Sequence, residues 1–462
     1  MIKELKRYQC SSCNTYYTKW EGRCDACGEW NTIEEASSNI SAIEKITSKN
    51  KINSVNKISF QTLTSDTNIP ERISTGFKEF DKVCGGGIVR GSTILLGGEP
   101  GIGKSTLVLQ VSSFLSNKYQ CMYISGEESV HQIQNRANRL NIEKDNNLKL
   151  ATETSLMNII HSLEQSPKTP DILIIDSIQT VHLSTVSGIP GSISQVRSCS
   201  QEIISICKKL NIALIIIGHV TREGQIAGPK TLEHMVDAVL YFEGDNANQF
   251  RIIRAVKNRF GASEEIGVFQ MEEKGLTEVL NPSSMFLNDY QNNVSGASVF
   301  AGVEGTRSML FEVQSLVVDS NFSTPRRSVI GCDSNRLMMI LAVLETRGRL
   351  LFNQKDTYIN ITGGLKITDA AADLAIAASL LSSYYETQLP ENSVFIGEIS
   401  LSGMIRNSLY IKKRINEAVN LGFTNIYLPK SSISDNIKNI NAANLLPINH
   451  IFDLITLIKS SD

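Results

Sequence analysis

The apolar segments of the chain are short, and some of them have a polar residue at or next to their end. Residues 92–96 (STILL), 171–176 (DILIID) and 212–220 (IALIIIGHV) are such segments; the second ends in Asp176, and the third has His219 next to its end. Short continuous apolar runs are typical of strands that are buried on both faces of a parallel sheet. The stretch 107–115 (LVLQVSSFL) has the length and composition of a buried helix and follows a glycine-rich segment. The pattern predicts an α/β domain.

The glycine-rich segment has the spacing of a phosphate-binding loop. Residues 97–106 read GGEPGIGKST and contain G-x-x-x-x-G-K-[ST] between the predicted strand and helix, which is the context this motif requires. Its backbone N–H groups and the helix N-terminus would bind phosphates. Lys104 would reach the β- and γ-phosphates of ATP, and Ser105 would bind Mg²⁺ beside Thr106. The predicted loop residues are Gly98, Glu99, Pro100, Gly101, Ile102, Gly103, Lys104, Ser105 and Thr106.

Polar residues at three other strand ends complete a candidate ATPase site. Asp176 ends one apolar run and is the candidate magnesium carboxylate. The run 121–129 has Glu127 and Glu128 near its end, one of which would activate the attacking water. His219 would sense the γ-phosphate. Each residue alone is equally consistent with a solvated strand end. Ligands of α/β sheets bind at the carboxyl ends of strands, so the combination favours a site.

Four cysteines near the start of the chain form two C-x2-C pairs. Cys10, Cys13, Cys24 and Cys27 have the spacing C-x2-C-x10-C-x2-C. Such pairs predict a closed four-thiolate zinc site whose metal stabilises a segment too short to have a core. A redox pair would need only one C-x2-C. The other five cysteines are scattered and are expected to be small buried residues.

Composition limits the remaining possibilities. The chain has 462 residues, and 45 basic against 47 acidic side chains give a net charge of −2, which excludes a uniformly basic nucleic-acid binder. No apolar run reaches about 18 residues, so no membrane span is predicted. The start MIKELKRYQC has no features of a secretory signal, and a cytoplasmic location is expected. Residues 33–66 are rich in Ser, Asn, Lys and Thr and are predicted to be a flexible linker.

Four stretches resemble one bacterial protein family. They are CGGGIVRGSTILLGGEPGIGKSTLVLQ (84–110), YISGEES (123–129), GHVTREGQIAGPKTLEHMVDAVLYFEG (218–244) and KNRFG (257–261). With the four cysteines they resemble the RadA (Sms) family of DNA repair proteins. The resemblance implies a RecA-like ATPase core related to DnaB-type helicases, a hexameric ring on DNA and a role in branch migration. It also implies that Glu127 is the catalytic glutamate and that RecA recombinase is a partner.

KNRFG also has an interpretation from its residues. Lys257 and Arg259 alternate in the strand-like run FRIIRAVKNRF, which would put both on one side of a strand. At a subunit edge, such a pair would enter the neighbouring nucleotide site and stabilise phosphoryl transfer. Placement in the neighbouring site rests on analogy with related hexameric motors. The alternative is a solvated basic strand edge.

Two polar, glycine-rich segments follow core strands and are candidates for DNA contact. They are 186–198 (VSGIPGSISQVRS) and 221–230 (TREGQIAGPK), and the matching loops of RecA-like proteins line the DNA channel. Arg197, Arg222 and Lys230 are the candidate phosphate contacts, although each is equally consistent with a solvated loop cation. Neither segment contains an aromatic residue for base stacking. We therefore expect backbone-dominated, salt-sensitive binding to single-stranded and branched DNA.

From about Ser295 the chain resembles the Lon protease domain. The resemblance lies in EGTRSMLFEVQSLV (304–317), INITGGLKITDAAADLAIAAS (359–379) and GEISLSGMIRNSLYIKKRINEAVNLGF (397–423). Lon uses a Ser–Lys dyad. Alignment on Asp369 puts Ala372 at the serine position, while the lysine is retained as Lys412, so no peptidase activity is expected. A basic face could be formed by Arg307, Arg326, Arg327, Arg347 and Arg349.

These observations predict an α/β protein with three folded parts. The expected folded parts are a zinc knuckle (1–32), a RecA-like P-loop ATPase domain (67–280) and an inactive α+β Lon-protease-like domain (281–462). A flexible linker (33–66) is expected between the first two. The expected function is a DNA-dependent ATPase that works as a homo-hexameric motor with ATP, Mg²⁺ and Zn²⁺. The alternatives are an ATP-dependent protease and a nucleotide-switched DNA-binding scaffold that does not translocate.

Overall fold

The computed structural model describes most of the chain beyond residue 70 and short parts before it. The described ranges are 8–10, 16–17, 22–24, 29–30, 32–35, 71–142, 147–219, 230–244, 250–287, 290, 294–322, 324–362, 367–433 and 443–460. The chain divides into two compact units, Met1–Ile69 and Pro70–Asp462. Within the described residues, no helix combines the length and the apolar character that a membrane crossing requires.

The first unit contains a small antiparallel sheet. Its strands are β1 (Tyr8–Cys10), β2 (Tyr16–Tyr17) and β3 (Ile33–Glu35), in the order β2-β1-β3. The pairing of Cys10 with Ile33 extends this sheet three residues into the segment expected to be linker. The rest of the predicted linker lies outside the described residues.

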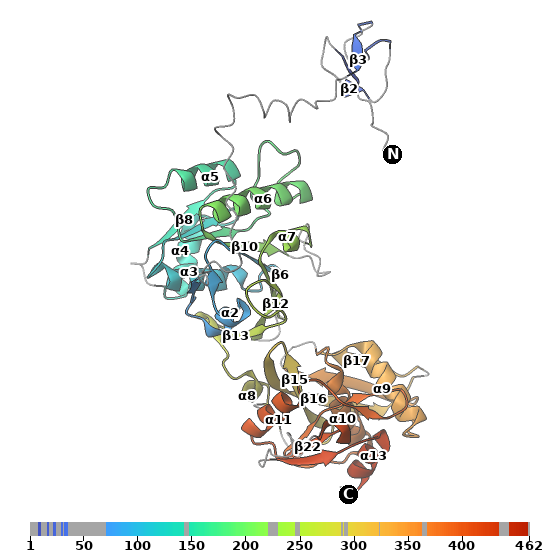
Figure 1. Ribbon diagram of the computed structural model, residues 1–462. Helices are drawn as coiled ribbons and strands as arrows, with labels where there is room; N and C mark the ends of the chain where they lie inside the picture. The colour runs from blue at the N-terminus through green and yellow to red at the C-terminus, as the bar shows by residue number, and fades with distance from the viewer. Residues whose placement is uncertain are drawn as a thin grey trace, which may run out of the picture. The chain divides into compact units, whose positions relative to one another are not determined.

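The second unit contains a mixed nine-stranded sheet in the order β14-β13-β12-β11-β6-β10-β9-β7-β8. Figure 1 labels β6, β8, β10, β12 and β13 of this sheet. The six strands from β11 to β8 are parallel, whereas β12, β13 and β14 extend the sheet as antiparallel strands. The strands are β6 (Thr93–Gly98), β7 (Cys121–Ser125), β8 (Leu148–Thr152), β9 (Ile172–Asp176), β10 (Ala213–His219), β11 (Ala238–Glu243), β12 (Phe250–Asn258), β13 (Ile266–Glu272) and β14 (Gly275–Glu278). A separate pair, β4 (Arg72–Ile73) and β5 (Ile88–Val89), precedes them.

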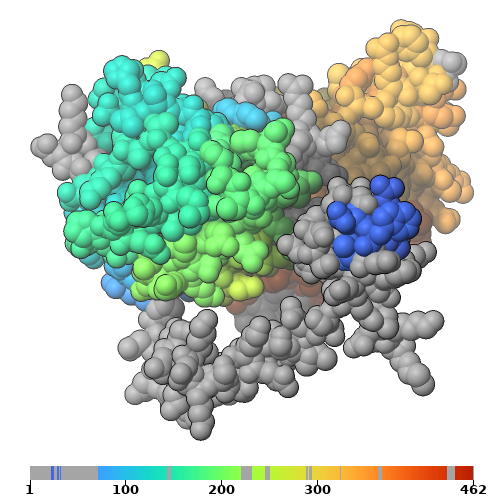
Figure 2. All heavy atoms as spheres, turned by 90° about the horizontal axis from the view of Figure 1, so that it is seen from above, coloured from blue at the N-terminus to red at the C-terminus, as the bar shows by residue number. Residues whose placement is uncertain are grey.

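Helices cover both faces of this sheet. On one face, α2, α3 and α4 contribute Phe80, Leu107 and Ile133 to one apolar core. On the other, α5, α6 and α7 contribute to a second core. The helices are α2 (Lys78–Val83), α3 (Lys104–Ser116), α4 (Val130–Arg139), α5 (Leu156–Glu164), α6 (Ile193–Lys209) and α7 (Lys230–Met235). In Figure 2, parts of this second layer, turquoise to green, form the surface facing the viewer.

The C-terminal part is built around one buried helix. Along α10 (Asp373–Tyr385) eleven consecutive residues, Asp373 to Ser383, are buried. The sheets beside it have the orders β15-β16-β18-β17 and β19-β22-β23, with a hairpin β20-β21. The elements are α8 (Pro282–Phe286), β15 (Ala297–Glu304), β16 (Arg307–Asp319), β17 (Arg327–Ile330), α9 (Ser334–Thr346), β18 (Lys355–Ile361), η3 (Ala370–Ala372), α10, β19 (Ser393–Phe395), β20 (Glu398–Ile399), β21 (Ile405–Arg406), α11 (Ile411–Asn420), β22 (Asn425–Leu428), η4 (Lys430–Ser432), β23 (Asn444–Pro447) and α13 (Ile451–Lys459).

The antiparallel end of the large sheet shares its core with the C-terminal part. Ile252 of β12 and Ile266 and Val268 of β13 belong to the same apolar cluster as Val299 and Phe311 of β15 and β16. The two parts are therefore joined by packed side chains as well as by the chain itself.

Candidate nucleotide site

The glycine-rich loop lies between β6 and α3, as its motif predicts. Gly98 ends β6 and α3 begins at Lys104. Gly103 has a φ of +117°, a conformation that L side chains rarely adopt. A Cβ at Gly98 would lie 2.7 Å from the carbonyl oxygen of Phe242, so a side chain there would collide with β11. Both glycines are thus required by the backbone path of the loop.

Lys104 is held inside the loop by the loop's own carbonyl groups. Its Nζ donates to the carbonyl oxygens of Gly98 at 2.7 Å and Glu99 at 2.8 Å, and the residue is 3% exposed. Burial lowers the pKa of Lys104 to about 8, although the charges of Asp176 and Glu127 act in the opposite direction. The loop therefore places one buried cation at the start of the helix, where an anionic phosphate group would stabilise its charge.

Asp176 stands at the edge of the sheet that carries this loop. It ends β9 and is 4% exposed. In the sheet, β10 lies between β6 and β9, pairing His219 with Gly98 and Ile217 with Asp176. The phenol of Tyr123, on β7, donates a hydrogen bond to Oδ2 of Asp176. The carboxylate is thus oriented from within the protein, next to the loop.

Glu127 follows β7 and is fixed by two side chains. Oε1 of Glu127 accepts from Ser177 Oγ at 2.5 Å and lies 3.0 Å from Nε2 of His219. The hydrogen bond with His219 is the main cause that lowers the pKa of Glu127 to about 2. Glu127 is consequently ionised at neutral pH, as a residue that accepts a proton from water must be. Its neighbour Glu128 pairs instead with Arg136 of α4.

Together these residues have the donor set that a magnesium nucleotide requires. The loop supplies backbone N–H groups and Lys104 for phosphates, and Ser105 and Asp176 supply the oxygen ligands that Mg²⁺ prefers. Ser105 and Thr106 are partly buried on the first turn of α3. The predicted nucleotide residues therefore converge, and Tyr123 and Ser177 join them. Neither carried a sequence signal, because each acts through another side chain.

Lys257 and Arg259 differ from the expected pair on one side of a strand. β12 ends at Asn258, so Arg259 lies beyond the strand. Nζ of Lys257 donates to the carbonyl oxygens of Glu233 at 2.6 Å and Val236 at 2.8 Å. Glu233 lies in the last turn of α7 and Val236 follows its last residue, so both carbonyls are at the helix C-terminus, where C=O groups lack helical partners and attract an ammonium group. Lys257 is thus engaged within its own chain.

Arg259 remains accessible. Its side chain is 59% exposed, and its Nη1 lies 3.4 Å from Oδ1 of Asp237. An exposed ion pair of this length is weak. The guanidinium of Arg259 is therefore available to a second molecule.

The DNA candidates are described only in part. Arg197 lies in α6 and is exposed, so it belongs to a helix and not to the loop predicted for 186–198. The buried residues Val196, Cys199, Ile203 and Cys207 have the helical spacing that the prediction overlooked. Arg222 lies outside the described residues. Lys230 begins α7, and its side chain is not described.

The cysteine cluster is also described only in part. Cys24 is fully buried, and Cys10 ends β1. Cys13 and Cys27 lie outside the described residues, among which no group of three metal-ligating side chains occurs. A buried thiol in so short a segment is consistent with zinc as the core of this unit.

In the C-terminal part, the position of the missing serine is closed. Ala372 ends η3 and is 2% exposed, whereas Lys412 is exposed on α11. Asp369 is not free, because its Oδ2 forms an ion pair with Arg414 at 2.6 Å. The residues that resemble Lon's dyad therefore offer no hydroxyl nucleophile.

The basic face expected from five arginines is not formed by all of them. Arg307 pairs with Glu79 of α2 at 2.5 Å, and Arg327 donates to the carbonyl oxygen of Phe352 at 2.7 Å. The guanidinium of Arg326 stacks on the ring of Phe322. Arg347 and Arg349 are exposed. Arg307 and Arg327 are structural ties, because their charges are used to satisfy buried acceptors.

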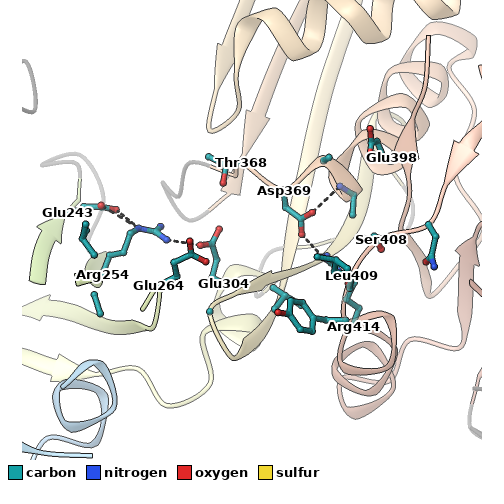
Figure 3. A pocket seen from close by; sticks show the side chains of 18 residues that line it. Glu243, Arg254, Glu264, Glu304, Thr368, Asp369, Glu398, Ser408, Leu409 and Arg414 are labelled. Atoms are coloured by element: carbon teal, nitrogen blue, oxygen red, sulfur yellow. Dashed lines mark hydrogen bonds and ion pairs between the residues drawn. The ribbon is translucent and has the colours of Figure 1, made fainter. Parts of the chain in front are cut away.

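A cavity of about 850 Å³ lies between residues of β11 and β12 of the large sheet and residues around Asp369 of the C-terminal part (Figure 3). One side carries Arg254, whose Nη1 lies 2.6 Å from Glu304, and the other carries the pair of Asp369 and Arg414. Glu243, Glu264 and Glu398 also line it. Both arginines are thus already paired with carboxylates, and this cavity is separate from the loop that carries Lys104.

Comparison with known proteins identifies the family. The chain is 49% identical over 461 residues to the DNA repair protein RadA of Rickettsia typhi, covering 99% of this chain and 100% of that protein. The chain belongs to the RadA family. The RadA proteins of Rickettsia bellii and Bacillus subtilis are 48% and 44% identical, covering 100% and 94% of this chain and 100% and 94% of the respective relatives. The predicted resemblance to RadA is confirmed.

Family models match three parts of this RadA family member. The KaiC ATPase model matches residues 73–283, the model of subunit ChlI of Mg-chelatase matches 335–432, and a rubredoxin metal-binding domain matches 8–35. These matches confirm the predicted fold class, with a RecA-like ATPase core, an N-terminal zinc ribbon and a C-terminal ChlI- and Lon-like domain. As in the RadA family, the chain is an ATPase of DNA repair and recombination.

Proposed function

We propose that this chain is an ATP-driven DNA motor that works as a homo-hexamer and drives branch migration of recombination intermediates. The observation that carries the proposal is the convergence of Lys104, Asp176, Glu127 and His219 at one edge of the sheet. Glu127 lies where two polar side chains hold it ionised, beside a loop built for phosphates. The family name and the ATPase match support DNA as the substrate.

In the proposed cycle, the chain's own residues bind, orient and accept a proton. The loop and Lys104 bind the phosphates, while Mg²⁺, held by Ser105 and Asp176, would neutralise charge on the phosphate oxygens. Glu127 accepts the proton of the attacking water through Oε2, since Oε1 is used by Ser177 and His219. A γ-phosphate that contacts His219 would disturb the hydrogen bond between His219 and Glu127. His219 also ends β10, shortly before the proposed DNA-contacting segment 221–230.

Communication between subunits is assigned to the residues after β12. Arg259 is the proposed trans-acting group, because its guanidinium is exposed next to Asp237. Lys257 joins the same segment to the end of α7 through two carbonyl oxygens. Movement of α7 on DNA contact would therefore move the segment that carries Arg259. Arg197, Arg222 and Lys230 are the proposed phosphate contacts, and RecA recombinase is the proposed partner.

Two assays test this function together. Phosphate release should rise with added single-stranded DNA, and labelled strands should be displaced from a branched DNA with ATP. Lys104→Ala, which removes the buried cation, is the matched control and should abolish both. DNA-stimulated hydrolysis without strand displacement would replace the motor with a nucleotide-switched scaffold. Adding RecA recombinase to the branched-DNA assay tests whether it is a partner. If it is, strands should be displaced faster in its presence.

A further inference from the structure

We propose that Tyr123 is a positioning residue for the magnesium ion, acting through the carboxylate of Asp176. This inference rests on the proposed function only as far as nucleotide binding, and does not depend on DNA or on translocation. Tyr123 touches neither phosphate nor water in this role. It fixes the side chain that binds the ion.

The contact is built inside the sheet. Tyr123 and Asp176 lie on the neighbouring parallel strands β7 and β9, where Tyr123 pairs with Ile174 and Ser125 pairs with Asp176. The phenol therefore bridges one pleat of the sheet toward its carboxyl edge and donates to Oδ2 of Asp176. Tyr123 has no exposed surface and Asp176 is 4% exposed, so water does not compete for this hydrogen bond.

The position of the phenol makes it a fixed donor to one oxygen of the carboxylate. Tyr123 is fully buried in the same apolar cluster as Leu107 and Ile133, and its hydroxyl donates to Oδ2 of Asp176. This hydrogen bond engages Oδ2 within the protein, so we assign Oδ1 to the cation or to its bound water.

The geometry gives Asp176 one orientation where an unsupported carboxylate would have several. Groups that hydrogen-bond to a metal ligand fix its rotation, and their loss typically costs about 10–100-fold in metal affinity or activity. Tyr123 is also a fully buried member of the apolar cluster that includes Leu107 of α3 and Ile133 of α4. The ring is therefore held in place even when its hydroxyl is removed.

Tyr123→Phe in the full chain tests the assignment. The readout is binding of a fluorescent ADP analogue at increasing Mg²⁺ concentration, without hydrolysis and without DNA. We expect the half-saturating Mg²⁺ concentration to rise about 10-fold, with binding in EDTA unchanged. Tyr241→Phe is the matched control, because Tyr241 lies on β11 of the same sheet and its phenol also donates to a carboxylate, that of Glu233 on α7, at 2.9 Å. It should leave the Mg²⁺ requirement within twofold.

Two further measurements test whether Tyr123 acts through Asp176 and whether a loss of folding explains the result. Asp176→Asn should itself raise the Mg²⁺ requirement, and adding Tyr123→Phe to it should cause no further rise. A further rise of equal size would overturn the role through Asp176. If Tyr123→Phe does not fold, 3-fluorotyrosine is placed at 123 in the otherwise natural chain. Its ¹⁹F resonance should then shift when Mg²⁺ is added to the ADP-bound protein, and a resonance that does not move overturns the proposal.

The outcomes are distinct from those for the motor. A natural chain that binds no ADP analogue would refute the nucleotide site itself and the proposed function with it. Normal magnesium-dependent binding by Tyr123→Phe would refute only the role of Tyr123. Failure to displace strands, with the expected Mg²⁺ shift intact, would refute the motor and leave Tyr123 assigned.

Discussion

Arg307→Ala should destabilise the junction between the ATPase sheet and the C-terminal part. Arg307 begins β16, and its Nη1 lies 2.5 Å from Oε2 of Glu79 on α2. Its Nη2 donates to the carbonyl oxygen of Leu280 at 2.6 Å. The side chains of Arg307 and Glu79 are only 13% and 7% exposed. The substitution therefore removes a guanidinium from a site in which its carboxylate partner stays buried.

The magnitude follows from what remains for Glu79. Removing one member of a buried ion pair costs about 3–5 kcal/mol, because the other charge is left uncompensated. Oε2 of Glu79 keeps one partner, the backbone N–H of Val268 at 2.9 Å, so the lower end of that range applies. We expect a loss of about 3 kcal/mol, which at a urea m-value of about 3 kcal/mol/M lowers the unfolding midpoint by about 1 M.

The assay is urea unfolding of the full chain, followed by circular dichroism. Arg347→Ala is the matched control, because Arg347 is an exposed arginine of the same domain and its loss should cost less than about 0.5 kcal/mol. Glu79→Gln in the Arg307→Ala chain removes the orphaned charge and should recover part of the lost stability. A midpoint for Arg307→Ala within error of the control, or a double variant that is less stable still, would refute this reasoning.

Four further predictions concern the sites. Glu127→Gln should lower ATP hydrolysis about 10²–10⁴-fold, measured as phosphate release, with ADP-analogue binding unchanged; near-normal turnover would exclude it as the base. Arg259→Ala should keep nucleotide binding and lower hydrolysis about 10³-fold or more. Mixing it with Lys104→Ala should restore activity in mixed rings, and no recovery in rings shown to be mixed refutes the trans role. Cys24→Ser should release zinc, measured by metal analysis, and leave ATPase activity in place; a full zinc equivalent contradicts the assignment. Ala372→Ser should give little or no casein degradation, since a hydroxyl at a 2% exposed position lacks access to substrate; rapid degradation would show that only the serine had been lost.

Local segments could be predicted from the sequence, whereas contacts between distant segments could not. The strand, loop and helix around Lys104 follow from one motif and its flanking apolar runs, because every determinant lies within about 25 neighbouring residues. The hydrogen bond between Tyr123 and Asp176 joins residues 53 apart, and the ion pair between Arg307 and Glu79 joins residues 228 apart. The sequence around Tyr123 or Arg307 does not show which distant residue each side chain contacts, since tyrosine and arginine occur throughout strands and loops.

The two partial failures have local causes. Glycine and serine in the segment 186–198 favoured a loop, but the spacing of buried residues from Val196 onward starts a helix at Ile193. Lys257 was expected to face a neighbouring subunit because strand alternation was the only available guide. The carbonyl groups at the C-terminal end of α7 are acceptors that alternation does not reveal, and they bind the ammonium group.

The core shared by β12, β13 and the C-terminal part has a consequence for truncated forms of the chain. An ATPase fragment ending near residue 280 would leave Ile252, Ile266 and Val268 facing water, and such an apolar β-surface favours aggregation. A gene that lost its last third would therefore encode an aggregation-prone protein. The C-terminal part therefore has a role that needs no serine, because it keeps the apolar edge of the ATPase sheet out of water.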